Sequence, residues 1–224
     1  VKSWYPDAND ASFRDHDMKK ERKRLSLLML GLVLAPMAWA DAGADLAAKL
    51  KALRSLDADF TQTTLASKGK PDSVVLGHIQ VQKPGYFRWE VRRPYSQILV
   101  SDGRELKIFD PDLQQMTIRP VSQELSQTPA MLFTGNVSAL QKQFTIREKK
   151  NGASVIYTLT PKAKDAIFAD LSLQFKGKEP LSMHLRDSLG QQTQIEFFRV
   201  KRNRALPASA FKFTPPSGTD IIRE

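Results

Sequence analysis

The chain contains no cysteine and few histidines. The lack of cysteine excludes disulfides and thiol catalysis, and it excludes the lipid anchor that some bacterial proteins carry on a cysteine directly after the signal peptide. Only His78 and His184 follow residue 40, and neither has a second histidine at the spacing of a metal site. Both occupy polar positions of alternating segments, as surface histidines do, so no metal is expected.

Motifs of the common enzyme classes are also missing. The chain has no H-E-x-x-H, no G-x-S-x-G, no Walker A loop and no G-x-G-x-x-G. Its candidate carboxylates fall in turns or at the starts of strand-like segments, where turn and capping roles account for them. These absences favour a protein that is not an enzyme and needs no cofactor. A triad assembled from distant residues stays open, which leaves an exported hydrolase as an alternative.

The first 40 residues contain the pattern of a secretory signal. A basic cluster at 19–24 precedes an apolar run at 25–37, and residues 38–40 (Ala-Trp-Ala) place small residues where a signal peptidase cuts. The apolar run is shorter than the roughly 20 residues that a membrane-spanning helix needs. We therefore expect a signal peptide over residues 18–40 and a freely soluble periplasmic domain over residues 41–224.

Residues 1–17 are polar and acidic and do not fit a signal peptide. Met18 directly heads the basic cluster, so we expect Met18 to be the translation start and residues 1–17 to be a non-native N-terminal extension. Residues 1–40 hold seven of the 34 basic and five of the 24 acidic side chains, which leaves 27 and 19, a net charge of +8, for residues 41–224. This balance favours anionic partners. Export separates the chain from nucleic acid, so we expect the anionic partner to be a membrane surface. The alternative is that the positive charge only keeps the protein soluble and binds no partner.

Residues 45–56 read as a helix with a single apolar stripe. Leu46, Leu50 and Leu53 recur at helical spacing, and Asp45 is placed to cap the first turn. A second helical signal lies at 128–133, where a proline at the first helical position precedes an apolar run, and residues 137–143 form a possible third helix. Each stripe must face something apolar.

Most of the remaining chain reads as ten or eleven short strands separated by turn signals. The clearest alternation places Phe87, Trp89 and Val91 on one face and charged residues on the other. Phe211 and Phe213 predict a last short strand. The predicted fold class is mainly β with α: a single curved antiparallel sheet that curls into a full or partial barrel, with the helices covering its apolar face.

Several segments, in this order and spacing, resemble the LolA family of outer-membrane lipoprotein carriers of Gram-negative bacteria. They are Phe-Thr-Gln at 60–62, Lys-Pro-Gly-Tyr-Phe-Arg-Trp at 83–89, Ile-Leu-Val-Ser-Asp-Gly at 98–103, Thr-Pro-Ala-Met-Leu at 128–132 and Phe-Lys-Phe-Thr-Pro-Pro at 211–216. The resemblance implies an incomplete β-barrel of about 11 strands with an α-helical lid over an apolar cavity. It also implies a monomer that takes lipoproteins by their acyl chains from an inner-membrane ABC transporter, the Lol complex, and delivers them to the outer-membrane acceptor LolB. A lipid-binding or sensor module of the same fold is the alternative.

The resemblance also implies roles for individual residues. The expected cavity lining comes from the first helix, the clearest strand and the second helical segment: Leu50, Leu53, Phe87, Trp89, Val91, Met131, Leu132 and Phe133. Ordinary core packing is the alternative for each. Many relatives hold the lid shut with an arginine where this chain has Lys83. Lysine offers three donors on a compact ammonium and arginine five on a rigid fork, so we expect Lys83 to bond a carbonyl near Leu50 or Phe133 as a weaker latch, the alternative being an exposed lysine without such a contact.

Overall fold

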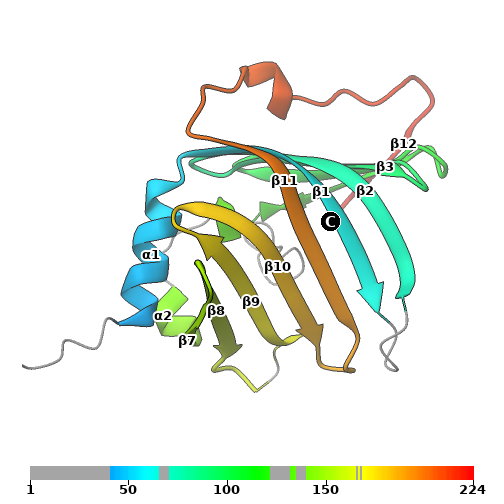
Figure 1. Ribbon diagram of the computed structural model, residues 1–224. Coiled ribbons are helices and arrows are strands. Elements are labelled where there is room, and N and C mark those ends of the chain that lie inside the picture. The colour runs from blue at the N-terminus through cyan, green and yellow to red at the C-terminus, as the bar shows by residue number, and fades with distance from the viewer. Residues whose placement is uncertain (1–40, 66–70, 122–131, 135–139, 165, 167) are drawn as a thin grey trace, which may run out of the picture. The chain divides into compact units, whose positions relative to one another are not determined.

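One sheet of twelve strands forms the body of the described chain (Figure 1). The computed structural model describes residues 41–65, 71–121, 132–134, 140–164, 166 and 168–224, which belong to one compact unit spanning residues 39–224. The strand order is β12-β6-β5-β4-β3-β2-β1-β11-β10-β9-β8-β7. The strands are β1 (Ser55–Leu65), β2 (Pro71–Gln82), β3 (Tyr86–Arg93), β4 (Gln97–Asp102), β5 (Glu105–Asp110), β6 (Gln115–Pro120), β7 (Phe144–Asn151), β8 (Ser154–Pro161), β9 (Phe168–Lys176), β10 (Glu179–Asp187), β11 (Gln192–Arg202) and β12 (Asp220–Arg223).

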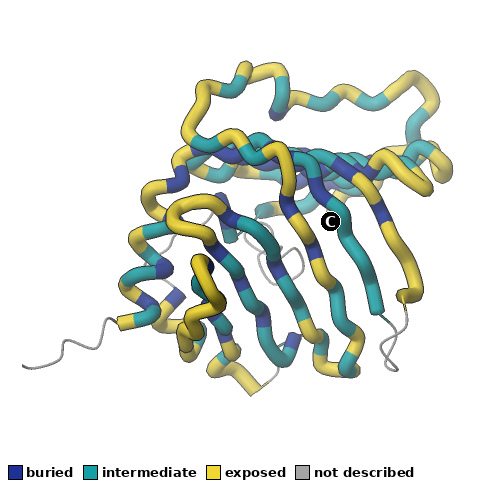
Figure 2. The backbone as a smooth tube through the Cα atoms, in the orientation of Figure 1, coloured by how far each residue is buried: buried dark blue, intermediate teal, exposed yellow. Residues whose placement is uncertain are grey.

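The prediction of one curved antiparallel sheet is confirmed, with one parallel strand added at its edge. Strands β1 to β11 pair only antiparallel, and the extra strand β12 pairs parallel with β6. Buried and more exposed positions alternate over residues 171–176 of β9 (Figure 2), because successive side chains of a strand point to opposite faces. One face of the sheet therefore carries the core.

Helix α1 (Ala42–Ala52) lies beside the sheet and begins earlier than predicted (Figure 1). Its N-cap is Asp41, whose side chain accepts a hydrogen bond of 2.9 Å from the Gly43 backbone N–H. The expectation that Asp45 caps the helix is wrong, because Asp45 lies within the first turn. The helix also ends before residue 56, since the backbone of Leu53 is extended and β1 begins two residues later.

A short helix, α2 (Leu140–Gln143), follows within the segment where a third helix was expected. The predicted strand at Phe211 and Phe213 is wrong. Residues Ala208–Phe211 form the 3₁₀ helix η4, and β12 follows it. In Figure 1 the segment that carries η4 passes along the face of the sheet away from α1.

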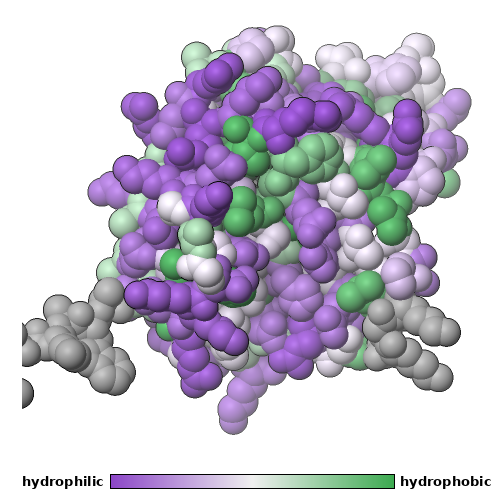
Figure 3. All heavy atoms as spheres, viewed as in Figure 1, coloured by the Kyte–Doolittle hydropathy of each residue, from purple (hydrophilic) through white to green (hydrophobic). Residues whose placement is uncertain are grey.

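The two faces of the sheet differ in what covers them. The inner face carries the main core, into which the leucines of α1 also pack. The outer face carries a smaller cluster of Phe109, Met116 and Ile118 under Phe213. The side of the molecule seen in Figure 3 is largely hydrophilic, with apolar side chains scattered among polar ones. No helix among the described residues is long and apolar enough to cross a membrane.

Candidate functional site

An aromatic cluster forms the centre of the inner wall. The rings of Phe60 and Trp89 stack with centroids 3.7 Å apart, and the Phe87 ring lies nearly parallel to Trp89 at 6.4 Å. The three rings share a face because Phe60 pairs with Gly77 and Phe87 alternates with Trp89 along β3. Val91 follows on the same face and is 3% exposed. The wall is thus apolar across three neighbouring strands.

Helix α1 lies against β7 and packs its leucines into the same core as this wall. Leu46 and Leu50 are fully buried, and Leu53 is 2% exposed in the same core cluster as the aromatic rings. An amphipathic helix that places its apolar stripe on a sheet buries surface on both partners. The leucines predicted from the helical spacing are therefore buried in the core, and their role as cavity lining stays a prediction.

The second predicted helical segment is described only in part. Phe133 is fully buried and meets Phe197 of β11 edge-to-face, with ring centroids 5.8 Å apart. Leu132 is half-buried and packs against the same cluster. Met131 lies outside the described residues. Phe133 thus reaches the inner wall, since Phe197 pairs with Phe60 in the sheet.

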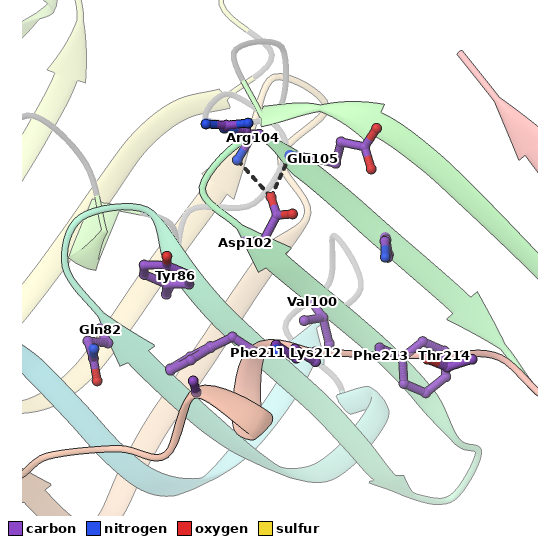
Figure 4. A pocket seen from close by; sticks show the side chains of 12 residues that line it. Gln82, Tyr86, Val100, Asp102, Arg104, Glu105, Phe211, Lys212, Phe213 and Thr214 are labelled. Atoms are coloured by element: carbon purple, nitrogen blue, oxygen red, sulfur yellow. Dashed lines mark hydrogen bonds between the residues drawn. The ribbon is translucent and has the colours of Figure 1, made fainter.

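The described wall residues are covered in this structure. Phe87 is 0%, Trp89 7% and Phe133 0% exposed. A cavity of about 660 Å³ lies instead on the outer face, between β3–β5 and the C-terminal segment (Figure 4). Tyr86 and Phe211 form part of its lining, with ring centroids 5.5 Å apart. Entry of a ligand to the inner wall therefore requires the cover to move.

Lys83 holds the C-terminal end of this cover. Its ammonium donates a hydrogen bond of 2.5 Å to the backbone carbonyl of Leu50, the contact that the latch hypothesis requires. Burial lowers the pKa of Lys83 from its ordinary value, because partial loss of water disfavours the ammonium. Leu50 is thus both a buried apolar contact and the acceptor of the bond. Whether this bond limits opening stays a prediction.

A second polar contact holds the first half of α1, and sequence reasoning missed it. The hydroxyl of Tyr157 on β8 donates to the carboxylate of Asp45. Burial, together with this hydrogen bond and the charges of Asp45 and Glu148, raises the pKa of the Tyr157 phenol well above its ordinary value. Lys49 extends the contact, with its ammonium 3.6 Å from Asp45 and 3.2 Å from the Gly177 carbonyl. A strand and a turn thus hold the first half of the helix.

The two histidines lie away from the inner wall. The His78 Nδ1 donates to the Asp59 carboxylate at 2.8 Å, and His184 contacts Gln192 at 3.2 Å. Burial raises the pKa of Asp59, but hydrogen bonds and positive charge from His78 and Arg199 outweigh it and leave that pKa below its ordinary value. No group of three metal-ligating side chains occurs among the described residues. Local stabilisation of β1 with β2, and of β10 with β11, accounts for these polar contacts.

Known proteins with similar sequences agree with this architecture. The family described as "Outer membrane lipoprotein carrier protein LolA" matches residues 51–214. An outer-membrane lipoprotein carrier protein of Alcanivorax borkumensis is 44% identical over 202 residues, 89% of this chain and 97% of the relative. One of Pseudomonas fluorescens Pf-5 is 42% identical over 175 residues, 78% of this chain and 84% of the relative.

Solved structures support the fold alone. A conserved protein of Thermus thermophilus superposes with a TM-score of 0.51 at 16% identity, over 81% of this chain and 97% of that one. The arrangement of one curved sheet with a helix on its apolar face therefore occurs at low sequence identity. With a family match that spans most of the sheet and relatives above 40% identity, the chain belongs to the LolA family of outer-membrane lipoprotein carrier proteins.

Proposed function

We propose that this chain is a periplasmic carrier that shields the acyl chains of lipoproteins between the inner and outer membranes. The observation that carries the proposal is the apolar inner wall of Phe60, Phe87 and Trp89, which shares one core with the leucines of a single amphipathic helix. An enzyme would need polar reacting groups at such a wall. A carrier needs only apolar surface that can be covered and uncovered.

The energetics fit exchange between the cover and the cargo. Uncovering Leu46 and Leu50 of α1 and Leu53 directly after it costs about 5–9 kcal/mol, at about 1.5–3 kcal/mol for each buried side chain. Burying one acyl chain of about 15 methylenes contributes about 12 kcal/mol, at about 0.8 kcal/mol per methylene. The acyl chain contributes about 3–7 kcal/mol more than uncovering the leucines costs, so cargo can displace the helix while much of its binding free energy is offset. When no cargo is bound, the packed helix also keeps water away from the apolar wall.

The remaining partners follow from the family and belong to the same proposal. An inner-membrane ABC transporter, the Lol complex, supplies the cargo, and the acceptor LolB takes it at the outer membrane. Residues 18–40 act as the signal peptide and residues 1–17 are an extension outside the native protein. N-terminal sequencing of the exported protein is expected to begin at Asp41, and any retention in the cytoplasm contradicts the proposed location.

The test uses inner membranes, ATP and a labelled lipoprotein. The wild-type chain is expected to release the lipoprotein as a soluble one-to-one complex. Phe87→Glu places a carboxylate on the inner wall, where it is costly to desolvate, and is expected to lose release. Val74→Glu is the matched control, because Val74 is 48% exposed on the neighbouring strand β2. Release by Phe87→Glu at the wild-type rate would show that Phe87 does not contact cargo.

A further inference from the structure

Asn203 joins the end of α1 to the end of β11. Its side-chain N–H donates to the Ala52 carbonyl at 3.0 Å, and its side-chain oxygen accepts from the Arg54 backbone N–H at 2.8 Å. Its own backbone N–H donates to the Ser55 carbonyl at 2.9 Å. The backbone of Asn203 has φ 58°, a conformation in which asparagine is enriched among non-glycine residues. Residues 51–54 and 201–204 are therefore fixed side by side.

Both joined segments carry positive charge. The cations are Lys51, Arg54, Lys201, Arg202 and Arg204, and they are called the basic end below. All are exposed except Arg202, which is half-buried. None of them takes part in an ion pair recorded for the described residues. The junction thus concentrates positive charge on two short segments.

The carboxylate across the strand pair from Lys201 is already engaged. Asp57 pairs with Lys201 in the register of β1 and β11. Its carboxylate accepts a hydrogen bond of 3.2 Å from Gln80 and lies 3.6 Å from the His78 ring. The cations of the basic end are therefore available to an anion from outside the chain.

We propose that the basic end binds the phosphate headgroups of an anionic membrane surface. Long lysine and arginine side chains reach headgroups without inserting apolar groups, and each cation near such a surface strengthens binding about fivefold. Residues 51–54 and 201–208 contain no aromatic residue. Single-stranded nucleic acid sites combine cations with aromatic stacking platforms, so headgroups are the better match.

The basic end lies next to the contact that holds the cover. The Lys83 backbone N–H donates to the Arg54 carbonyl at 2.9 Å, and the Lys83 side chain bonds Leu50. Docking through the basic end therefore brings the C-terminal end of α1 to the membrane. This consequence rests on the proposed carrier function, because it places the moving cover where cargo leaves or enters a bilayer. The binding itself does not depend on cargo.

Co-sedimentation with vesicles tests the proposal on the chain of residues 41–224. Vesicles of equal parts phosphatidylglycerol and phosphatidylcholine are compared with pure phosphatidylcholine, at about 0.05 M and about 0.3 M NaCl, where screening differs strongly. The wild-type protein is expected to bind the anionic vesicles alone and to lose binding at the higher salt. No binding to anionic vesicles overturns the proposal.

Two double variants separate the basic end from net charge. Lys201→Gln with Arg204→Gln is expected to weaken binding about 25-fold, at about fivefold per cation. Lys149→Gln with Lys150→Gln removes the same charge from exposed positions of β7 and is expected to change binding far less. Equal weakening by the two pairs overturns the proposal. Circular dichroism of each variant checks that the sheet is intact.

The cargo variant keeps this test independent of the proposed function. Phe87→Glu changes the inner wall and leaves the basic end in place, so it is expected to bind vesicles like the wild type. A chain that binds anionic vesicles but releases no lipoprotein would contradict the carrier function and support the membrane site. A chain that releases lipoprotein but does not bind the vesicles would support the carrier function and contradict the membrane site.

Discussion

Phe60 and Trp89 stack across Gly77, which lies between them on β2. A Cβ added at Gly77 would lie 2.2 Å from the Phe60 ring and 2.3 Å from the Glu90 carbonyl. The ring contact therefore depends on a missing side chain. The Phe60 ring occupies this space because the middle strand contributes only backbone there.

Gly77→Ala is expected to destabilise the fold. The added methyl meets both a buried ring and a backbone oxygen, and overpacking of this kind costs about 1–3 kcal/mol. Urea unfolding measures the loss. Gly152→Ala is the control, since nothing lies within 4 Å of its added Cβ and only its φ of 58° is strained. An equal or larger loss in the control would count against the packing explanation.

Lys83→Ala is expected to let the empty protein take up more of an apolar dye. The variant removes the bond to the Leu50 carbonyl, and loss of a hydrogen bond to a partly exposed ammonium is worth about 1 kcal/mol, or about a fivefold shift toward the open form. Fluorescence titration with the dye measures the shift. Equal uptake by the wild type and the variant would rule out the latch.

Lys83→Arg refines the same test. Arginine keeps a positive charge and adds donors in a planar fork, so it is expected to lower dye uptake below that of the wild type. An arginine variant that takes up dye like Lys83→Ala would show that the lysine geometry, rather than donor number, sets the strength of the latch.

Tyr157→Phe is expected to loosen the first half of α1. The phenylalanine keeps the ring in the core and removes the hydroxyl that donates to Asp45, which leaves the carboxylate with Lys49. Amide hydrogen exchange of residues 42–49 is expected to quicken about tenfold, for a charged hydrogen bond worth about 1.5 kcal/mol. Unchanged exchange in that segment would mean that packing alone holds the helix.

Alkaline pH provides an independent test of the same bond. The folded state raises the pKa of the Tyr157 phenol, so the folded protein keeps a proton that the unfolded chain releases near pH 10. The stabilisation is therefore complete below pH 10 and decreases as the pH rises beyond it. The free energy of unfolding of the wild type is expected to fall more steeply above pH 10 than that of Tyr157→Phe. Parallel pH profiles would contradict this assignment.

Asp59→Asn is expected to reduce stability at neutral pH by about 1–3 kcal/mol, because it removes the charge that His78 and Arg199 contact. The folded pKa of Asp59 lies below its ordinary 3.8, so its contribution is present above pH 3.8 and is lost as the pH falls below it. The difference in unfolding free energy between wild type and variant should therefore shrink in acid. A constant difference down to pH 2 would assign the effect to shape instead of charge.

Alternation along the strands was enough to predict the sheet and its inner face. Phe87, Trp89 and Val91 lie on that face because a strand has a strict period of two. Two of the turn signals between these strands are Pro-Gly at 84–85 and Asp-Gly at 102–103, and the structure explains their glycines. Gly85 and Gly103 have positive φ and lie so close that a Cβ on Gly85 would be 2.8 Å from the Gly103 Cα.

Contacts between distant parts of the chain could not be predicted in this way. Tyr157 and Asp45 are 112 positions apart, and no local pattern pairs them. Asp41 and Asp45 both fit an N-cap, and only the hydrogen bond to Gly43 decides between them. Phe211 and Phe213 alternate like a strand, but their rings contact Tyr86 and Phe109 on the outer face instead of joining a ladder.

The two ends of the strand order protect the protein from joining other copies of itself. At one end, β12 offers a partner only four residues of unpaired backbone. At the other, β7 carries four successive charged residues, Arg147, Glu148, Lys149 and Lys150. Short or charged border strands resist pairing with a second polypeptide. The proposed carrier cycle uncovers apolar surface, and such border strands would keep the open protein from growing into fibres by strand addition.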